Sequence, residues 1–102
     1  FNPDGESLNG ADFTGADLTN ANFIAAYLED AKLINAKLTG AEFVEAKLMG
    51  ADLTGADLTG ADLRVAFLMN ANLFGADLTD ADLTGANLSG ANLNCVNHPI
   101  CN

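Results

Sequence analysis

A strict five-residue repeat runs through almost the whole chain and limits what the chain can fold into. Leu or Phe occupies every fifth position from Leu8 to Leu93, eighteen times without a gap. Ala stands two residues before these positions from Ala11 to Ala91, the residue between is usually Asp or Asn, and the fifth is often Gly. Self-similarity of this kind is typical of repeat architectures.

A period of five fits neither regular secondary structure. On a helix at about 100° per residue, successive Leu residues would scatter around the cylinder. On a straight strand an odd spacing would place them alternately on opposite faces. An extended segment does point Ala and Leu, two residues apart, the same way, and a Gly in the fifth place accepts the positive φ of a corner. The repeat therefore predicts a polygonal coil with inward Ala–Leu pairs.

The repeated string Ala51-Asp52-Leu53-Thr54-Gly55 resembles the pentapeptide-repeat family, and the resemblance covers about residues 6–95. It implies an all-β fold, a right-handed quadrilateral β-helix of about five coils with 20 residues each. One observation supports the number twenty independently, because a Thr column recurs at that spacing: Thr19, Thr39, Thr59 and Thr79.

The ends of the chain depart from the repeat. We expect residues 1–95 to form the solenoid, with strict repeats over 8–93, a degenerate first side at Phe1–Gly5, and a C-terminal cap at 96–102. Val96 and His98 fall in the two inward phases of the repeat. Because a solenoid exposes unpaired strand edges at its ends, we expect a monomer or a weak end-to-end or face dimer.

Two cysteines and a histidine lie in the C-terminal tail and have three interpretations. Cys95 and Cys101 could form a disulfide that closes the last turn, remain free thiols, or bind a metal with His98. The disulfide is the favoured interpretation, and it indicates an oxidising compartment. The family resemblance implies the periplasm or the thylakoid lumen, with the cytoplasm as the alternative.

The composition argues against several classes of function. Fourteen acidic and four basic residues give a formal charge of −10, which disfavours binding to nucleic acid or to an anionic membrane. No apolar run approaches the ~20 residues that cross a bilayer. A single His and the lack of a Gly-rich phosphate loop leave no catalytic constellation and no cofactor site, so we expect no enzyme. The acids recur by repeat phase, as a solvated outward face would.

One side of the expected coil carries an unusual column of outward residues. At twenty residues per coil, Tyr27, Lys47 and Phe67 are stacked, and Met49 and Met69 stand in a second column on the same side. Lys47 would lie between two aromatic rings, a cation–π arrangement. These five residues are a candidate binding patch. The alternative is that the stacking of coils simply tolerates apolar residues here.

Two further sides hold most of the negative charge. Their main members form a candidate acidic surface: Asp57, Asp62, Asp77, Asp80 and Asp82. The family resemblance implies a possible use, because some members mimic DNA and inhibit type II topoisomerases. We predict a non-enzymatic structural or protein-binding module, with a protein as its partner. The alternative is an acidic DNA mimic that binds a DNA gyrase or a topoisomerase-like enzyme.

Overall fold

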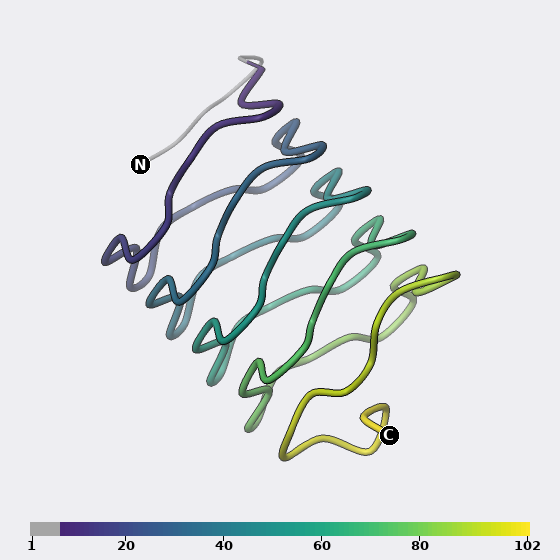
Figure 1. Ribbon diagram of the computed structural model, residues 1–102. Helices are drawn as coiled ribbons and strands as arrows, with labels where there is room; N and C mark the ends of the chain where they lie inside the picture. The colour runs from purple at the N-terminus through teal and green to yellow at the C-terminus, as the bar shows by residue number, and fades with distance from the viewer. Residues whose placement is uncertain (1–6) are drawn as a thin grey trace.

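The computed structural model describes residues 7–102 and shows a coil of stacked turns, with the first described residues (purple) and the last residues (yellow) at opposite ends of the stack (Figure 1). Parallel β-bridges join residues twenty apart, such as Ser7 to Tyr27, Tyr27 to Lys47 and Lys47 to Phe67. The predicted coil of twenty residues is therefore confirmed. The expected first side at Phe1–Gly5 lies outside the described residues.

Each pentad contributes a single bridged residue rather than a longer strand. Bridges fall on the residue before each central Leu or Phe, from Ser7 to Asn92, and on Val96 in the last turn, and residues 7–102 contain neither an extended strand nor a helix. Hydrogen bonds link the coils on both sides of that residue. The Phe67 N–H donates to the Ala46 carbonyl at 2.9 Å, and the Phe67 carbonyl accepts from the Leu48 N–H at 2.7 Å. The described part of the chain thus offers no helix that could span a bilayer.

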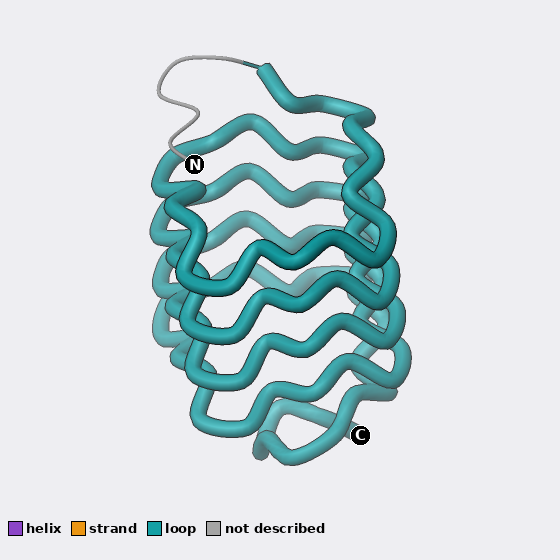
Figure 2. The backbone as a smooth tube through the Cα atoms, turned by 90° about the vertical axis from the view of Figure 1, so that its left-hand side faces the viewer, coloured by secondary structure: helices purple, strands orange, loops and turns teal. Residues whose placement is uncertain are grey.

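The coils lie one above another in the stack (Figure 2), and a turn that recurs every five residues gives each coil of twenty residues four sides and four corners. We number the sides by the central residues of three successive coils: side 1 is Leu28, Leu48 and Leu68; side 2 is Leu33, Leu53 and Leu73; side 3 is Leu38, Leu58 and Leu78; side 4 is Phe43, Leu63 and Leu83. Corners are tight turns. The Ala51 N–H, for example, donates to the Leu48 carbonyl at 3.0 Å, and Gly50 takes a φ of +69°.

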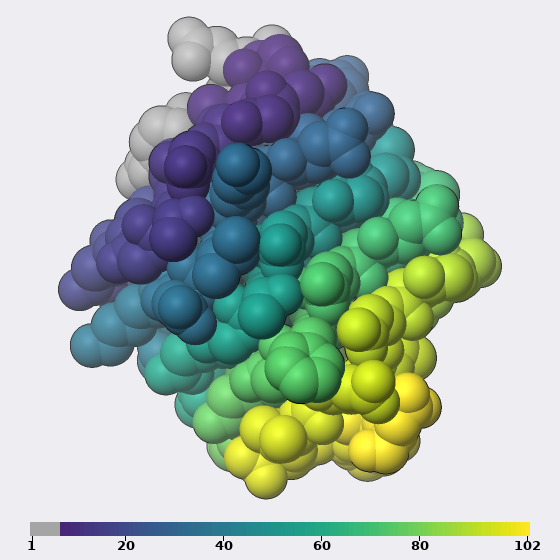
Figure 3. Space-filling view, in the orientation of Figure 1, coloured from purple at the N-terminus to yellow at the C-terminus, as the bar shows by residue number. Residues whose placement is uncertain are grey.

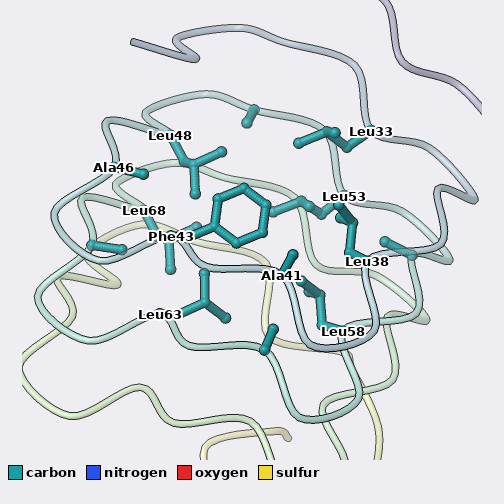
Figure 4. Close-up of a cluster of buried hydrophobic side chains, with 14 of the residues drawn as sticks. Leu33, Leu38, Ala41, Phe43, Ala46, Leu48, Leu53, Leu58, Leu63 and Leu68 are labelled. Carbon is teal, nitrogen blue, oxygen red and sulfur yellow. The ribbon is translucent and has the colours of Figure 1, made fainter. Parts of the chain in front are cut away.

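The interior is filled by the two inward columns of the repeat. Ala and the central Leu or Phe are buried in every pentad from Ala21 to Leu83. Phe23 and Phe43 stack with their ring centroids 5.1 Å apart, and Phe43 lies among leucines from several sides (Figure 4). Only a methyl group fits at the Ala positions because four sides converge on one narrow core, where a larger side chain would overpack.

The last turn loses one residue of register, so the expectation for Val96 is wrong. Val96 bridges to Asp77 and is 46% exposed, whereas Cys95 is 5% exposed and takes the inward place of Ala. The sequence between Leu93 and Val96 lacks the Ala-x-Leu pattern that would hold the frame. Cys95 instead forms a disulfide with Cys101, with the two Cα atoms 5.1 Å apart.

His98 is a capping residue at the end of the stack. Its Nδ1 accepts from the Ile100 N–H at 3.2 Å, so Nε2 carries the proton and donates to the Ala81 carbonyl at 3.0 Å. The Asn102 N–H donates to the Leu93 carbonyl at 2.8 Å. With both sulfurs in the disulfide and both ring nitrogens in hydrogen bonds, this segment holds itself under the last coil by its own contacts.

Candidate functional site

The predicted aromatic column exists as a stacked ladder on side 1. Successive bridges join Tyr27, Lys47 and Phe67. The Lys47 Nζ lies 4.8 Å from the centroid of the Tyr27 ring and 5.8 Å from that of Phe67. Both rings face solvent, with Tyr27 41% and Phe67 38% exposed. Lys47 is therefore held by cation–π attraction from both sides in the middle of an apolar surface.

The two methionines of the predicted patch lie beside this column and are half-buried. Met49 and Met69 each follow the central Leu of side 1, one coil apart. The Met69 carbonyl accepts from the Gly50 N–H at 2.9 Å, so the two coils are tied at this point. Met49 and Met69 add flexible apolar area at one edge of the column.

A second set of apolar side chains lies on the other edge of the column, and the sequence analysis missed it. Ile24 and Val65 are 43% and 45% exposed, and Val44 is half-buried in the same column as Ile24. They stand at the corner where side 4 turns into side 1, two or three residues before Tyr27 and Phe67. The signal was present in the sequence at the spacing of twenty, since Ile24 and Val44 share one slot.

The corner beside these residues has an unusual composition, and we call it the Val65 corner: Ala25, Glu45, Val65 and Gly85. Ala25, Glu45 and Val65 adopt φ values of +58°, +59° and +49°. This left-handed conformation crowds the Cβ atom and is a genuine outlier for a β-branched residue. The Val65 corner therefore stores local strain that a Gly in the same place would not.

Phe67 also replaces a residue that would stabilise the next turn. From residue 52 to residue 92, each residue directly before a central Leu, except Phe67, is an Asp or Asn. Its Oδ1 accepts a hydrogen bond from the N–H two residues later. An example is Asp57, whose Oδ1 accepts from the Thr59 N–H at 3.1 Å and from its hydroxyl at 2.6 Å. A phenyl ring cannot accept such a bond, so the turn after Phe67 lacks this support.

The acidic surface consists largely of these same turn-capping carboxylates, which stabilise turns as well as facing outward. The Thr59 hydroxyl and then its N–H lower the pKa of Asp57. Asp77 and Asp82 have a pKa lowered in the same way, by the Thr hydroxyl two residues later. Each Oδ1 is thus committed to the fold, and Asp57 has a further side-chain hydrogen bond with Thr39 of the preceding coil.

The arrangement of the acidic surface is laddered. Asp57 bridges to Asp77 on side 3, and Asp62 bridges to Asp82 on side 4, while Asp80 occupies the corner between these sides. Arg64 offsets part of the charge, because its Nη2 donates to the Asp62 Oδ2 at 2.6 Å and its Nε to Oδ1 at 2.8 Å. The Arg64 hydrogen bonds lower the pKa of Asp62. Asp57, Asp77 and Asp82 have no hydrogen bond to a basic side chain among residues 7–102.

The outer surface is formed by coils that lie as parallel bands (Figure 3). Residues 7–102 contain no pocket, and they bring no three His, Cys, Asp or Glu side chains into an arrangement that could hold a metal ion. The features with chemical character in this part of the chain are therefore surfaces: the apolar area around the aromatic column and the laddered carboxylates.

The repeat region of this chain matches known proteins. A family model described as pentapeptide repeats matches residues 7–33, 26–64 and 67–97, with eight copies. The crystal structure of Rfr23, a pentapeptide repeat protein from the cyanobacterium Cyanothece 51142, is similar, with a TM-score of 0.85 and 36% identity, covering 90% of this chain and 64% of that chain. No curated protein matches this sequence.

A second solved structure gives the same result. The pentapeptide repeat protein alr5209 from Nostoc PCC 7120 has a TM-score of 0.74 and 43% identity, covering 76% of this chain and 64% of that chain. The chain thus spans 64% of the length of each of these two relatives. With its repeats matched from residue 7 to residue 97, the chain belongs to the pentapeptide-repeat family.

Proposed function

We propose that this right-handed, four-sided β-helix is a non-enzymatic module that binds a protein partner through the aromatic column of side 1. The observation that carries the proposal is the place of Phe67. The slot before the central Leu holds a turn-capping Asp or Asn at all the remaining positions from residue 52 to residue 92, whereas at Phe67 it holds an exposed ring. Packing inside the chain does not require a ring that faces solvent, whereas an interface does.

A second candidate is an acidic DNA mimic that binds a gyrase-like enzyme. It is favoured by the bridging of Asp57 to Asp77 and of Asp62 to Asp82, which repeats carboxylates from coil to coil. It is weakened by the use of each Oδ1 in a turn and by the Arg64–Asp62 ion pair. The role of the aromatic column inside the fold is limited to its cation–π contacts with Lys47, so we place it first.

The proposed setting is an oxidising compartment, the periplasm or the thylakoid lumen, with residues 96–102 acting as the C-terminal cap. The disulfide between Cys95 and Cys101 supports this, because reducing compartments keep such thiols apart. Two reactive thiols in protein isolated from its source, measured by thiol titration without reductant, would instead place it in the cytoplasm.

Affinity capture with matched baits tests the proposal. Immobilised wild-type protein, Phe67→Ala and Asp57→Asn/Asp77→Asn would be exposed to an extract of the source organism, and bound proteins would be quantified by mass spectrometry. We expect Phe67→Ala to lose a partner that the wild type and the Asp-to-Asn variant retain. Loss with the Asp-to-Asn variant alone, together with inhibition of gyrase supercoiling by the wild type, would favour the DNA mimic.

A further inference from the structure

The apolar area on side 1 continues around the Val65 corner and forms one ridge. We define the Val65 ridge by its five apolar side chains: Ile24, Tyr27, Val44, Val65 and Phe67. In each of three successive coils the ridge carries one side chain from the end of side 4 or its corner and one from the middle of side 1. Lys47 takes the side 1 place in the middle coil, between the two rings.

Two independent departures from the repeat fall on this ridge. Val65 is β-branched at a φ of +49°, and Phe67 replaces a turn cap. Each departure lowers local stability, and each places an apolar side chain in solvent. Local rules that are broken without a gain inside the fold are expected at functional positions. The ridge is therefore better explained by what it contacts than by what it stabilises.

The spacing along the ridge favours a helix as the occupant. Successive coils repeat about every 4.8 Å. A helix laid along the solenoid axis repeats a side-chain face about every 5.4 Å, so two of its turns span the three coils with little mismatch. An extended segment repeats the same face only about every 6.7 Å, which is a poorer fit.

The charges beside the ridge indicate the charge of that helix. Carboxylates border both edges: Glu42 and Glu45 toward side 4, and Glu29 and Asp30 toward side 2. Glu42, Glu45 and Asp30 are exposed. Two bases lie at the ridge. Lys47 has its ammonium group against the two rings, and Arg64, directly before Val65, is paired with the Asp62 carboxylate. An apolar stripe with Lys or Arg on its flanks would meet these four carboxylates in the first two coils of the ridge, whereas the third coil presents Met69 and the paired Arg64 at its edges.

A second copy of the chain fits this ridge less well. A two-fold axis through the middle coil would bring Lys47 against Lys47 and Glu45 against Glu45 of the other copy. Like charges directly opposite each other are destabilising. From the strained corner, the spacing and the borders we infer that the Val65 ridge binds a cationic amphipathic helix of a partner protein. This inference rests on the proposed function and specifies its partner.

Three synthetic peptides test the inference by fluorescence anisotropy against the intact protein in physiological salt. The first is a fluorescent helical peptide with Leu in one stripe and Lys on both flanks. The second has Glu in place of Lys, and the third has Ser in place of Leu. We expect the Leu/Lys peptide to bind at least ~10-fold more tightly than either of the others, because both the apolar stripe and the flanking charge contribute.

Variants of the protein locate the binding. Val65→Gly and Phe67→Asp should each weaken binding of the Leu/Lys peptide by about 5- to 20-fold, as the loss of a central anchor does. Their Tm values should be no lower than that of the wild type, because both changes follow the local rules of the repeat. The matched control is Asn35→Gly, the same kind of change at the diagonally opposite corner, and it should leave the affinity unchanged.

Several results would overturn the inference. They are equal binding of the Ser/Lys peptide, tighter binding of the Leu/Glu peptide, no binding of the Leu/Lys peptide up to about 1 mM, or affinities that Val65→Gly and Phe67→Asp do not change. In each case the proposed function would still stand if Phe67→Ala removed a partner in affinity capture. Peptide binding at the ridge, with no partner lost from the Phe67→Ala bait, would support the Val65 ridge as a helix-binding surface and contradict the proposed function.

Discussion

The Val65 corner and the three other corners share one backbone conformation but not one kind of residue. At the other three, every left-handed position from residue 10 to residue 90 is Gly, Asn or Asp, the residues that accept a positive φ most easily. At the Val65 corner, the same conformation is taken by Ala25, Glu45 and Val65. The geometry of the corner is therefore set by the coil, and the residue that occupies it is a separate choice.

The comparison also shows how corners stack. Where Asn or Asp occupies a corner, Gly often follows one coil later, because the Asn or Asp side chain lies over it: Asn20 over Gly40, Asp30 over Gly50, Asn35 over Gly55 and Asn70 over Gly90. At the Val65 corner the Val65 side chain lies over Gly85 in the same way. What differs is thus the chemistry presented to solvent: Gly, amides and carboxylates at three corners, and the apolar Ala25 and Val65 with Glu45 between them at the fourth.

The largest effect is expected where a corner would suffer both strain and overlap. In Gly55→Val the new Cβ would overlap the Asn35 Oδ1, and Val would adopt a φ of +68°. We expect a loss of about 2 kcal/mol in the free energy of unfolding, measured by chemical denaturation, most of it from the left-handed φ because the Asn35 side chain can turn away from the new Cβ. The double variant Asn35→Gly/Gly55→Val removes the overlap and should recover part of the loss. No recovery would show that overlap plays no part.

A smaller loss is expected at an open corner. The Cβ of Gly60→Val meets no atom within 4 Å, while the φ of +67° remains unfavourable for Val. Strain alone should then cost about 1–2 kcal/mol. The value measured for Gly60→Val calibrates the strain that Val65 carries at its own corner. A variant as stable as the wild type would mean that a Val side chain does not strain a left-handed corner, and Val65 could then not be called strained.

Much of this architecture was predictable from spacing alone. The coil of twenty residues and the stacking of Tyr27, Lys47 and Phe67 follow from a repeat without insertions, since one register applies to every coil. The frame change at Val96 was not predictable, because the tail lacks the Ala and Leu that specify phase. There the inward place goes to Cys95, whose position is set by a disulfide and not by the repeat.

The Val65 corner was visible in the sequence but was not recognised. The fifth residue of the pentad is often Gly when all four corners are taken together. Only when the corners are separated at a spacing of twenty does the column of Ala25, Glu45 and Val65 stand out. The role of Asp57 was missed for a related reason. Its recurrence indicates an outward position, but only coordinates show that its Oδ1 accepts two hydrogen bonds from Thr59. Periodicity therefore places residues on sides, whereas hydrogen-bond partners have to be observed.

Relief of strain should appear as a gain in stability at the Val65 corner. Val65→Gly removes an unfavourable left-handed Val, and the greater freedom of Gly in the unfolded chain offsets part of the benefit, so we expect a net gain of about 0.5–1 kcal/mol. Asn70→Gly at a neighbouring corner should be close to neutral, because Asn tolerates this conformation. If Val65→Gly were clearly destabilising, contacts of Val65 with the coil below would outweigh its strain.

The smallest effect joins the corner to the missing turn cap and depends on pH. Phe67→Asp would place a carboxylate in the slot where Asp57, Asp77 and Asp82 have a pKa lowered first by a Thr hydroxyl and then by an N–H of the following turn. Residue 69 is Met, so only the N–H is available to the introduced carboxylate. Asp57 has an opposing contribution from neighbouring Asp77, whereas the introduced carboxylate would bridge to Lys47 and Asn87. At pH 7 we expect a gain of about 0.5 kcal/mol in the free energy of unfolding, because a hydrogen-bonded cap and an opposite-charge pair replace one cation–π contact.

A carboxyl whose pKa is lower in the folded chain than in the unfolded chain stabilises the fold above the unfolded pKa of about 3.9. The gain should therefore disappear as the pH falls below about 4 and through the folded pKa. The gain of Val65→Gly comes from the backbone and should persist in acid, so urea midpoints of the two variants at pH 7 and pH 3 separate the two causes. A gain of Phe67→Asp that is equal at both pH values would show that the turn after residue 67 is not stabilised by a carboxylate cap.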